Sequence, residues 1–293
     1  MNRWHRRMTE DLQLRGLSER TQEAYLRAVR KLAEHFGTPP GQLAEAQIRE
    51  YLLHLKNERE FAPGSMRIAL NGIKFYYRYS EPRQWATLLN VRIAPQRTLP
   101  DVLAVEEVRR LLAVVNTTHN RAYLWTIYSC GLRLNEGLHL QVGDIDAARM
   151  MVHVHRGKGA KDRFVILPQG TLLLLRKYWA AHRNPKLLFP ALGRDRKQGR
   201  TAKQPMAEAS VQGAIKRVVD QLGLTKSVSI HTLRHSYASH LIEAGVSLRR
   251  VQQLLGHRSL QTTMRYLHVT EPDRERTREI IDALMHDAAD GID

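Results

Sequence analysis

Residues 150–167 read MMVHVHRGKGAKDRFVIL, and here the chain shows strand-like patterning. Two runs rich in β-branched and aromatic residues, Met150–His155 and Phe164–Leu167, flank a basic turn that contains two glycines. Such runs on either side of a glycine-bearing turn are typical of a β-hairpin. The patterning elsewhere is helical. We therefore predict a mainly α protein with a small antiparallel β-sheet.

The part of the chain before residue 90 has the spacing of helices. Ser18 is placed to cap a helix whose apolar residues recur with a helical period, and Gly37 ends that helix. A second amphipathic segment is centred on Leu52, and a third begins near Pro63. With a short helix around Met8, the pattern predicts about four helices in this part of the chain.

A stretch that contains Pro95 and Pro100 interrupts the helical pattern and has the composition of a linker. A chain of 293 residues is also long enough for two compact domains. We predict a helical domain at residues 1–92, a linker at 93–100 and a second domain at 101–293.

The last third of the chain returns to helical patterning. Glycines and serines at fixed places give the helix limits, because serine caps the beginning of a helix and glycine commonly follows its end. We predict four helices: His231 to Ala244 before Gly245, one capped by Ser247 and ended at Gly256, one capped by Ser259 that carries Tyr266, and Asp273 to Met285.

The chain carries 46 Lys and Arg against 29 Asp and Glu, a formal net charge of +17. Such an excess favours a polyanionic partner. Nucleic acid fits better than a membrane, because no apolar run approaches the length that spans a bilayer. Charge alone fits RNA binding as well as DNA binding. The segment from Arg194 to Lys203 is strongly basic and fits a loop near phosphate or a merely solvated one.

The first residues and the single cysteine indicate the compartment. The chain begins with a basic stretch, but no apolar segment of a signal peptide follows it. Cys130 is the only cysteine, which excludes an intrachain disulfide and a cysteine-rich zinc site. We expect a reducing, cytoplasmic location.

Several motifs hold residues suited to cleaving a phosphodiester without a metal. That reaction needs a hydroxyl nucleophile, cations for the charge on the phosphate oxygens and an acid for the leaving 5′ oxygen. Arginine suits the second task because its planar fork holds two oxygens and keeps its proton. The candidates are Arg133, Lys158, His231, Arg234, His257 and Tyr266.

Each candidate also has an ordinary structural interpretation. Arg133 with Glu136 fits a surface ion pair at a helix corner, and the spacing of His231 and Arg234 also arises by chance. A tyrosine in a helix, such as Tyr266, is commonly half-buried core. The order of the whole set is more informative than any single member.

The ordered set resembles the tyrosine recombinase family of phage-type integrases, with the Xer and integron-type integrases as the nearest relatives. The motifs that carry this resemblance are Gly131-Leu132-Arg133 with Glu136, Gly157-Lys158-Gly159, His231-x-x-Arg234, Leu255-Gly256-His257 and Tyr266. The resemblance covers nearly the whole chain. It implies an N-terminal four-helix, SAM-like domain that binds DNA and a C-terminal mixed α+β catalytic domain.

The resemblance also implies a role for each candidate. Tyr266 is the nucleophile that forms a 3′-phosphotyrosyl bond, Arg133 and Arg234 hold the phosphate, and Lys158, with Lys161 as a nearby rival, is the general acid. His231 and His257 line the site, one helping proton movement and the other bonding the phosphate. Glu136 orients an arginine. No cofactor, metal or ATP is expected.

The function that the resemblance implies is site-specific recombination of double-stranded DNA. Members of the family act as tetramers on two DNA sites, and the free protein is expected to be a monomer or a dimer. Two alternatives stay open, which are DNA relaxation like that of a type IB topoisomerase and a non-catalytic DNA-binding regulator on the same fold. The helix predicted at Asp273 to Met285 either docks on a neighbouring protomer or completes its own core.

Overall fold

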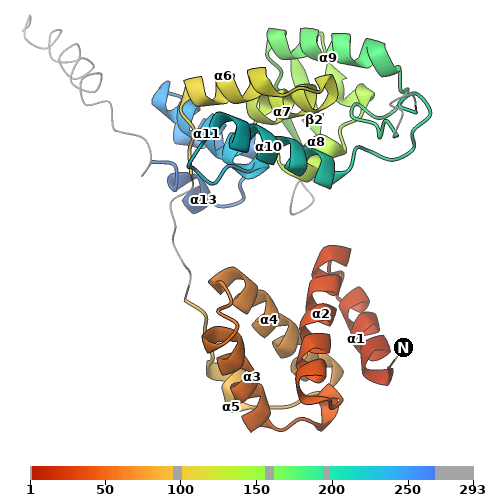
Figure 1. The fold of residues 1–293 in the computed structure, drawn as a ribbon, viewed down its shortest axis with the longest axis vertical. Coiled ribbons are helices and arrows are strands. Elements are labelled where there is room, and N and C mark those ends of the chain that lie inside the picture. The colour runs from red at the N-terminus through yellow and green to blue at the C-terminus, as the bar shows by residue number, and fades with distance from the viewer. Residues whose placement is uncertain (1, 95–100, 156–161, 194–197, 268–293) are drawn as a thin grey trace, which may run out of the picture. The chain divides into compact units, whose positions relative to one another are not determined.

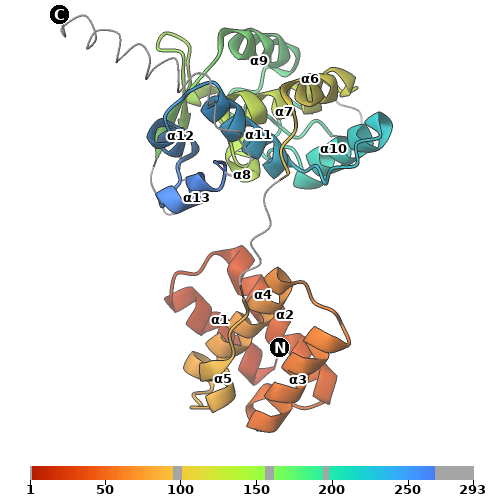
Figure 2. The same ribbon diagram turned by 90° about the vertical axis from the view of Figure 1, so that its left-hand side faces the viewer.

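The computed structural model describes residues 2–94, 101–155, 162–193 and 198–267 (Figures 1 and 2). The chain divides into two compact units, Met1–Thr98 and Leu99–Asp293. Each unit has a hydrophobic core of its own, which is the mark of a structural domain.

The first unit is helical. Its elements are α1 (Arg3–Leu14), α2 (Glu19–Phe36), α3 (Glu45–Asn57), α4 (Pro63–Phe75), α5 (Ala86–Asn90), a 3₁₀ turn at Pro40–Gln42 and a π-helical turn at Tyr76–Ser80. The four longer helices are those that the sequence predicts. Ser18 holds the N-cap position of α2, but its hydroxyl bonds Thr21 Oγ1 at 2.9 Å and accepts no backbone N–H.

Helices α2 and α4 form the main packing contact of the first unit. Gly72 on α4 explains their close approach, because a Cβ there would lie 3.0 Å from Ala28 Cβ on α2. The phenol of Tyr77 donates a 2.6 Å hydrogen bond to the carbonyl of Pro40 inside the same core. A buried tyrosine hydroxyl needs such a partner, so this bond ties the π-helical turn to the chain after α2.

The second unit surrounds the central helix α7 (Thr118–Cys130), as both views show (Figures 1 and 2). Helix α7 is largely buried and packs against five other helices of the described ranges. These neighbours are α6 (Val105–Val114), α8 (Leu134–Leu138), α9 (Gln169–His182), α10 (Glu208–Leu222) and α11 (Ile230–Glu243).

The predicted hairpin forms strands β2 (Met151–Val154) and β3 (Arg163–Ile166) of an antiparallel sheet with the order β1-β2-β3. Strand β1 (Ile145–Asp146) was not predicted, because two residues are too few to show an alternating pattern. Val152 pairs with Val165, and both are buried in the core. The alternate residues face outward, where the rings of His153 and Phe164 stack at 4.6 Å.

Helices α11, α12 (Leu248–Leu255) and α13 (Leu260–Met264) end the described chain. The hydroxyl of Ser247 accepts the Arg250 N–H and caps α12, as predicted. The prediction that Ser259 caps a helix carrying Tyr266 was wrong on two points. The Ser259 side chain makes no capping bond, and α13 ends at Met264. Tyr266 lies in the turn that follows, where its N–H bonds the Thr263 carbonyl in a tighter, 3₁₀-type turn.

The helix predicted at Asp273 to Met285 lies outside the described residues. Within the described ranges, no helix has both the length and the apolar character to span a lipid bilayer.

Candidate active site

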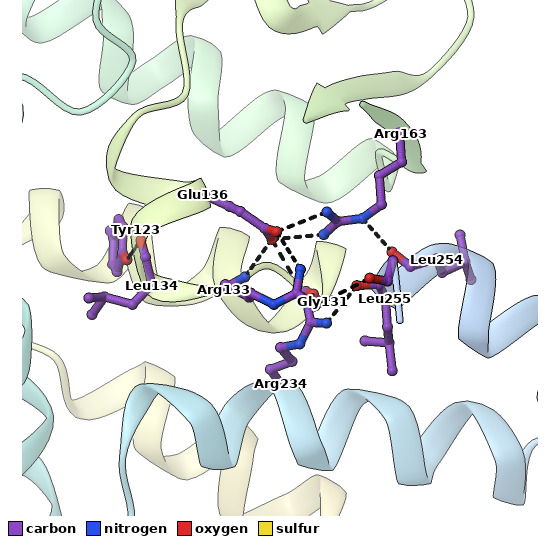
Figure 3. Close-up of polar contacts among 10 residues, drawn as sticks. Tyr123, Gly131, Arg133, Leu134, Glu136, Arg163, Arg234, Leu254 and Leu255 are labelled. Atoms are coloured by element: carbon purple, nitrogen blue, oxygen red, sulfur yellow. Dashed lines mark hydrogen bonds and ion pairs between the residues drawn. The ribbon is translucent and has the colours of Figure 1, made fainter. Parts of the chain in front are cut away.

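The carboxylate of Glu136 lies among three arginine side chains (Figure 3). Its Oε1 accepts from Arg133 Nη1 at 2.6 Å and from Arg163 Nη1 at 2.9 Å. Its Oε2 accepts from Arg163 Nη2 and from the Arg133 backbone N–H, both at 2.8 Å. Arg234 Nη1 is 3.7 Å from Oε2. Glu136 therefore serves as the common anion for all three cations.

The local sequence explains where this carboxylate lies. Arg133 is the N-cap residue of α8, and Glu136 sits three residues later, where an acidic side chain can reach back to the capping N–H. The Glu136 side chain is 6% exposed. Burial alone would raise its pKa, but hydrogen bonds from Arg163 and Arg133 and their charges lower this pKa to about 2. The carboxylate is therefore ionised throughout the neutral range.

The same three arginines bond three successive carbonyls at the end of α12, two of which Figure 3 labels. Arg163 Nε donates to the Leu254 carbonyl at 2.9 Å, Arg234 Nη2 to that of Leu255 at 2.6 Å, and Arg133 Nη2 to that of Gly256 at 3.3 Å. The last carbonyls of a helix lack partners inside the helix and carry its partial negative charge. The arginines therefore join the end of α12 to Glu136.

Arg234, on α11, is 3% exposed. Its Nη1 also donates to the carbonyl of Gly131, which follows α7 with φ +59°. A Cβ at Gly131 would lie 2.5 Å from the ring of Tyr237, so only glycine fits there. Burial and the charge of Arg133 lower the pKa of Arg234 to about 9, which leaves the group charged at neutral pH.

Tyr266 packs beside this arginine cluster and is 2% exposed. Burial raises the pKa of its phenol, while the charges of Arg234, Arg265 and Arg133 act in the opposite direction. The phenolic oxygen and Nδ1 of His235 share a hydrogen bond of 2.9 Å. The predicted nucleophile is therefore within the electrostatic reach of both predicted phosphate-binding arginines.

His235 follows Arg234 directly on α11. Burial first, and then the nearby His231, Arg265 and Arg234, lower its pKa to about 4. At neutral pH the imidazole is therefore uncharged, and the nitrogen that carries no proton can accept one.

His257 lies in the turn after α12, and its ring also packs on Tyr266. The two rings stack with centroids 6.2 Å apart and an interplanar angle of 18°. His257 Nδ1 is 2.9 Å from the hydroxyl of buried Thr263. Burial and the charges of Arg234 and Arg133 lower its pKa to about 3, so this histidine is also neutral.

The remaining predicted site residues differ in how the structure places them. His231 is exposed at the beginning of α11, and its ring centroid is 6.5 Å from that of His235. Lys158 and its rival Lys161 lie outside the described residues. The structure thus brings together Arg133, Arg234, His257 and Tyr266, and it places His231 one turn before His235.

Sequence reasoning missed two members of the cluster, Arg163 and His235. A signal for Arg163 was present, because strand alternation puts it on the same face as buried Val165, an unusual place for an arginine. His235 is four residues from His231 on a helix, so the two share a face. Neither position belongs to the motifs that carried the resemblance, which is why the motifs did not reveal them.

One group of side chains in the described ranges has the spacing of metal ligands. Asp144, His153 and His155 each offer a ligand atom within 4.8 Å of the others. The group already has internal partners, since His155 Nε2 bonds Asp144 Oδ1 at 2.6 Å and Asp162 Oδ2 lies 3.3 Å from His153 Nε2. The printed bonds of this group run among its own members and Asp162, so we assign it no part in the site.

Comparisons with known proteins follow the same division of the chain. The sequence model of the phage integrase family matches residues 101–272, and that of the phage integrase N-terminal SAM-like domain matches residues 4–87. The chain therefore belongs to the phage integrase family.

Curated relatives carry consistent names. A putative integrase/recombinase of Sinorhizobium fredii, y4qK, is 41% identical over 265 residues, which are 90% of this chain and 83% of the relative. The tyrosine recombinase XerD of Brucella suis is 34% identical over 91% of each chain. The tyrosine recombinase XerA of Thermococcus kodakarensis is 33% identical over 94% of each chain.

Solved structures support the fold. The XerH site-specific recombinase, bound to its palindromic difH substrate after cleavage, has a TM-score of 0.68 at 25% identity, covering 91% of this chain and 80% of that chain. The Tn1549 transposon integrase in complex with transposon right end DNA has a TM-score of 0.67 at 15% identity, covering 96% and 99%. The predicted fold class and the predicted enzyme class, a site-specific recombinase, are confirmed.

Proposed function

We propose that this site-specific recombinase cleaves and rejoins double-stranded DNA through a covalent bond between Tyr266 and a 3′ phosphate. One observation carries the proposal, which is that the Tyr266 phenol lies between the two arginine positions: it bonds His235, the residue after Arg234, and stacks on His257, the residue after the Gly256 carbonyl that Arg133 bonds. A nucleophile beside two fixed cations is the arrangement that attack on a phosphodiester requires.

The cleavage step assigns a task to each group. The Tyr266 oxygen attacks phosphorus, a phosphotyrosyl bond forms, and the bond from phosphorus to the 5′ oxygen breaks. Arg133 and Arg234 stabilise the charge on the two non-bridging oxygens. Of the described bases, His235 bonds the phenol and accepts its proton. Lys158 donates a proton to the leaving 5′ oxygen.

The histidines around the phenol complete the assignment. We assign His257, which stacks on Tyr266 and is neutral, a hydrogen bond to a phosphate oxygen. His231 precedes His235 by one helical turn and assists proton movement toward solvent, where it is exposed. Rejoining follows the reverse path, because the phosphotyrosyl bond keeps the energy of the broken bond and a 5′ hydroxyl can attack it. The proposed scheme requires no ATP and no metal.

A nicked suicide substrate tests the nucleophile, because the small fragment leaves and the covalent complex accumulates on a denaturing gel. Tyr266→Phe should bind DNA and form no covalent complex. Tyr128→Phe is a matched control, since the Tyr128 phenol also bonds a histidine Nδ1 at 2.9 Å in the same unit. A covalent complex formed by Tyr266→Phe would contradict the assignment.

The two alternative functions are not favoured by the relatives, which are named recombinases and integrases. An assay with two target sites separates the classes. A recombinase gives products that join DNA from both sites, whereas a type IB topoisomerase only relaxes supercoils and a regulator does neither.

DNA is the partner that the net charge of +17 and the family membership favour. We propose that residues 1–92 and 101–293 act as a DNA-binding domain and a catalytic domain, and that four protomers assemble on two sites. We also propose that the protein acts in the cytoplasm. Sedimentation with DNA that carries one or two sites measures the assembly, and sequencing the bound DNA identifies the site.

A further inference from the structure

Arg163, the first residue of β3, is an arginine on the inner face of a strand. It pairs with buried Val154 on β2, and its side chain is 10% exposed. Burying a guanidinium group is unfavourable unless it is fully paired. Arg163 is paired at all three nitrogens, with Glu136 at Nη1 and Nη2 and with the Leu254 carbonyl at Nε.

This full pairing distinguishes Arg163 from Arg133, one of the two arginines assigned to the phosphate. A guanidinium group has five N–H donors. Arg133 uses one side-chain bond to Glu136 and one to the Gly256 carbonyl, and its side chain is 24% exposed. The fork of Arg163 instead meets both oxygens of one carboxylate, the strongest arrangement of this pair. Arg163 is therefore built to hold the protein and not the DNA.

Three separate elements meet at Arg163 (Figure 3). The side chain extends from β3, its fork bonds Glu136 on α8, and its Nε bonds the end of α12. The residue after this end is Gly256, with φ +63°, and a Cβ there would lie 2.8 Å from Arg163 Cδ. Glycine at this place gives the arginine the room to cross. The contact between Arg163 and the end of α12 therefore depends both on the arginine, which donates the hydrogen bond, and on Gly256, which leaves space for the arginine side chain.

We propose that Arg163 is a positioning residue, which fixes the Glu136 carboxylate and the end of α12 so that Arg133, Arg234 and His257 address the same phosphate. The inference rests on the proposed function of Tyr266 and the two arginines. Glu136 fixes Arg133 through its side chain and its backbone N–H, and α12 leads directly into His257. Arg163 bonds both supports, Glu136 through its fork and the Leu254 carbonyl at the end of α12 through its Nε.

The test compares Arg163→Met and Arg163→Lys with the wild type in single-turnover cleavage of the suicide substrate, with DNA affinity measured separately. Arg163→Met should lower the cleavage rate by about 10²-fold, the usual effect of displacing a catalytic group by about 1 Å. Its DNA affinity should stay within about threefold, because Arg163 binds no phosphate. Arg163→Lys keeps the charge and should recover part of the rate.

Arg149→Met is the matched control. Arg149 lies next to the same sheet, but its side chain is 81% exposed and its ion pair with Asp146 is long, at 3.8 Å. Its cleavage rate should equal that of the wild type. Tyr266→Phe in the same assay reports separately on the proposed function, since it tests the nucleophile without touching Arg163.

A pH profile separates positioning from general damage to the fold. The charged groups that face Glu136 are Arg133 from α8, Arg163 from β3 and Arg234 from α11. Burial raises the pKa of Glu136, and Arg163 is a main group that lowers it. Without Arg163, the pKa of Glu136 should therefore rise. The acid limb of the cleavage rate should therefore move to higher pH in Arg163→Met, whereas general damage would lower the rate equally at every pH.

A double-mutant cycle completes the test. Adding Glu136→Gln to Arg163→Met should cost less than the sum of the two single changes, because both break the pair between Arg163 and Glu136. Wild-type cleavage by Arg163→Met, a loss confined to DNA affinity, or full additivity with Glu136→Gln would each overturn the proposal. If Arg163→Met does not fold, Arg163→Lys and Arg163→Gln give the same comparison of rate and affinity.

Discussion

The phenolic oxygen of Tyr266 lies 2.9 Å from Nδ1 of His235, the residue that follows Arg234 on α11. One helix thus carries both a cation that we assign to the phosphate and a base that bonds the proposed nucleophile. The two groups differ in charge at neutral pH, since burial lowers the pKa of His235 to about 4 while Arg234 stays protonated.

Replacing His235 should slow cleavage without preventing DNA binding. His235→Ala removes the acceptor of the phenolic proton, and general-base groups contribute about 10²–10⁴-fold to a rate. His240→Ala is the control, because His240 lies on the same helix and bonds the Tyr128 phenol instead. Single-turnover cleavage measures the effect, and equal rates for the two variants would remove His235 from the mechanism.

The pH dependence of wild-type cleavage should show the same base. His235 must be neutral to accept a proton, and its lowered pKa of about 4 keeps it neutral down to mildly acidic pH. The rate should therefore hold as pH falls from 7 to about 5 and decline only near 4. A decline centred near 6.5, the ordinary pKa of histidine, would indicate a different, solvated base.

Glu136 should stabilise the fold in a manner that depends on pH. Its pKa in the folded protein, about 2, is below the ordinary value of 4.5. Because this pKa is lower in the folded protein, the ionised carboxylate stabilises the fold above pH 4.5, and this stabilisation is lost as pH falls toward 2. Glu136→Gln should lower the free energy of unfolding at pH 7 by about 3–5 kcal/mol, the usual cost of removing one partner from a buried ion pair.

The control for this prediction is Glu106→Gln, since Glu106 forms an exposed ion pair with Arg109 at 3.5 Å. Exposed pairs contribute about 0–1 kcal/mol. Urea unfolding at pH 7 and pH 3 measures both variants. The difference between wild type and Glu136→Gln should shrink at the lower pH, and an unchanged difference would contradict the linkage.

Gly131→Ala should destabilise the second unit more than Gly223→Ala does. Both glycines have positive φ, +59° and +62°, where a side chain costs about 1–2 kcal/mol. Only at Gly131 would the new Cβ also meet a ring, that of Tyr237, at 2.5 Å. Urea unfolding of the two variants measures the excess at Gly131, and equal losses would show that Tyr237 moves aside freely.

DNA binding should weaken steeply with salt. Each phosphate that the protein neutralises adds about −0.9 to the slope of log affinity against log salt concentration. With a net charge of +17, several contacts of this kind are expected. Fluorescence anisotropy across a salt series measures the slope, and an affinity that does not change with salt would contradict a binding mode based on phosphate contacts.

The sequence was sufficient for the elements with strong local signals. Helices α1 to α4, α11 and α12 and the hairpin were predicted because their periodicity and their glycine and serine limits depend on nearby residues alone, whereas the 15-residue helix α10 was not predicted. Strand β1 and the π-helical turn at Tyr76–Ser80 were not, since one is too short to show a period and the other continues a helical pattern. The position of Tyr266 beyond the end of α13 depends on packing between distant segments.

The residues of the candidate site also divide into those that local motifs mark and those that only the folded structure reveals. Arg133, Arg234, His257 and Tyr266 were singled out because ordered motifs mark them. Arg163 acts through contacts with residues 27 and 91 positions away in the chain, which no local pattern encodes. Such a residue becomes visible only when the folded chain places its partners around it.

The three arginines hold the end of α12 through its main-chain carbonyls, and this determines which substitutions the protein can tolerate there. Every amino acid supplies the same carbonyl, so positions 254 and 255 can exchange one apolar side chain for another while the arginines keep their acceptors. Gly256 has no such freedom, since its backbone conformation and the crossing guanidinium both exclude a side chain. In divergent sequences, position 255 should therefore vary among apolar residues, whereas the next position, 256, should remain glycine.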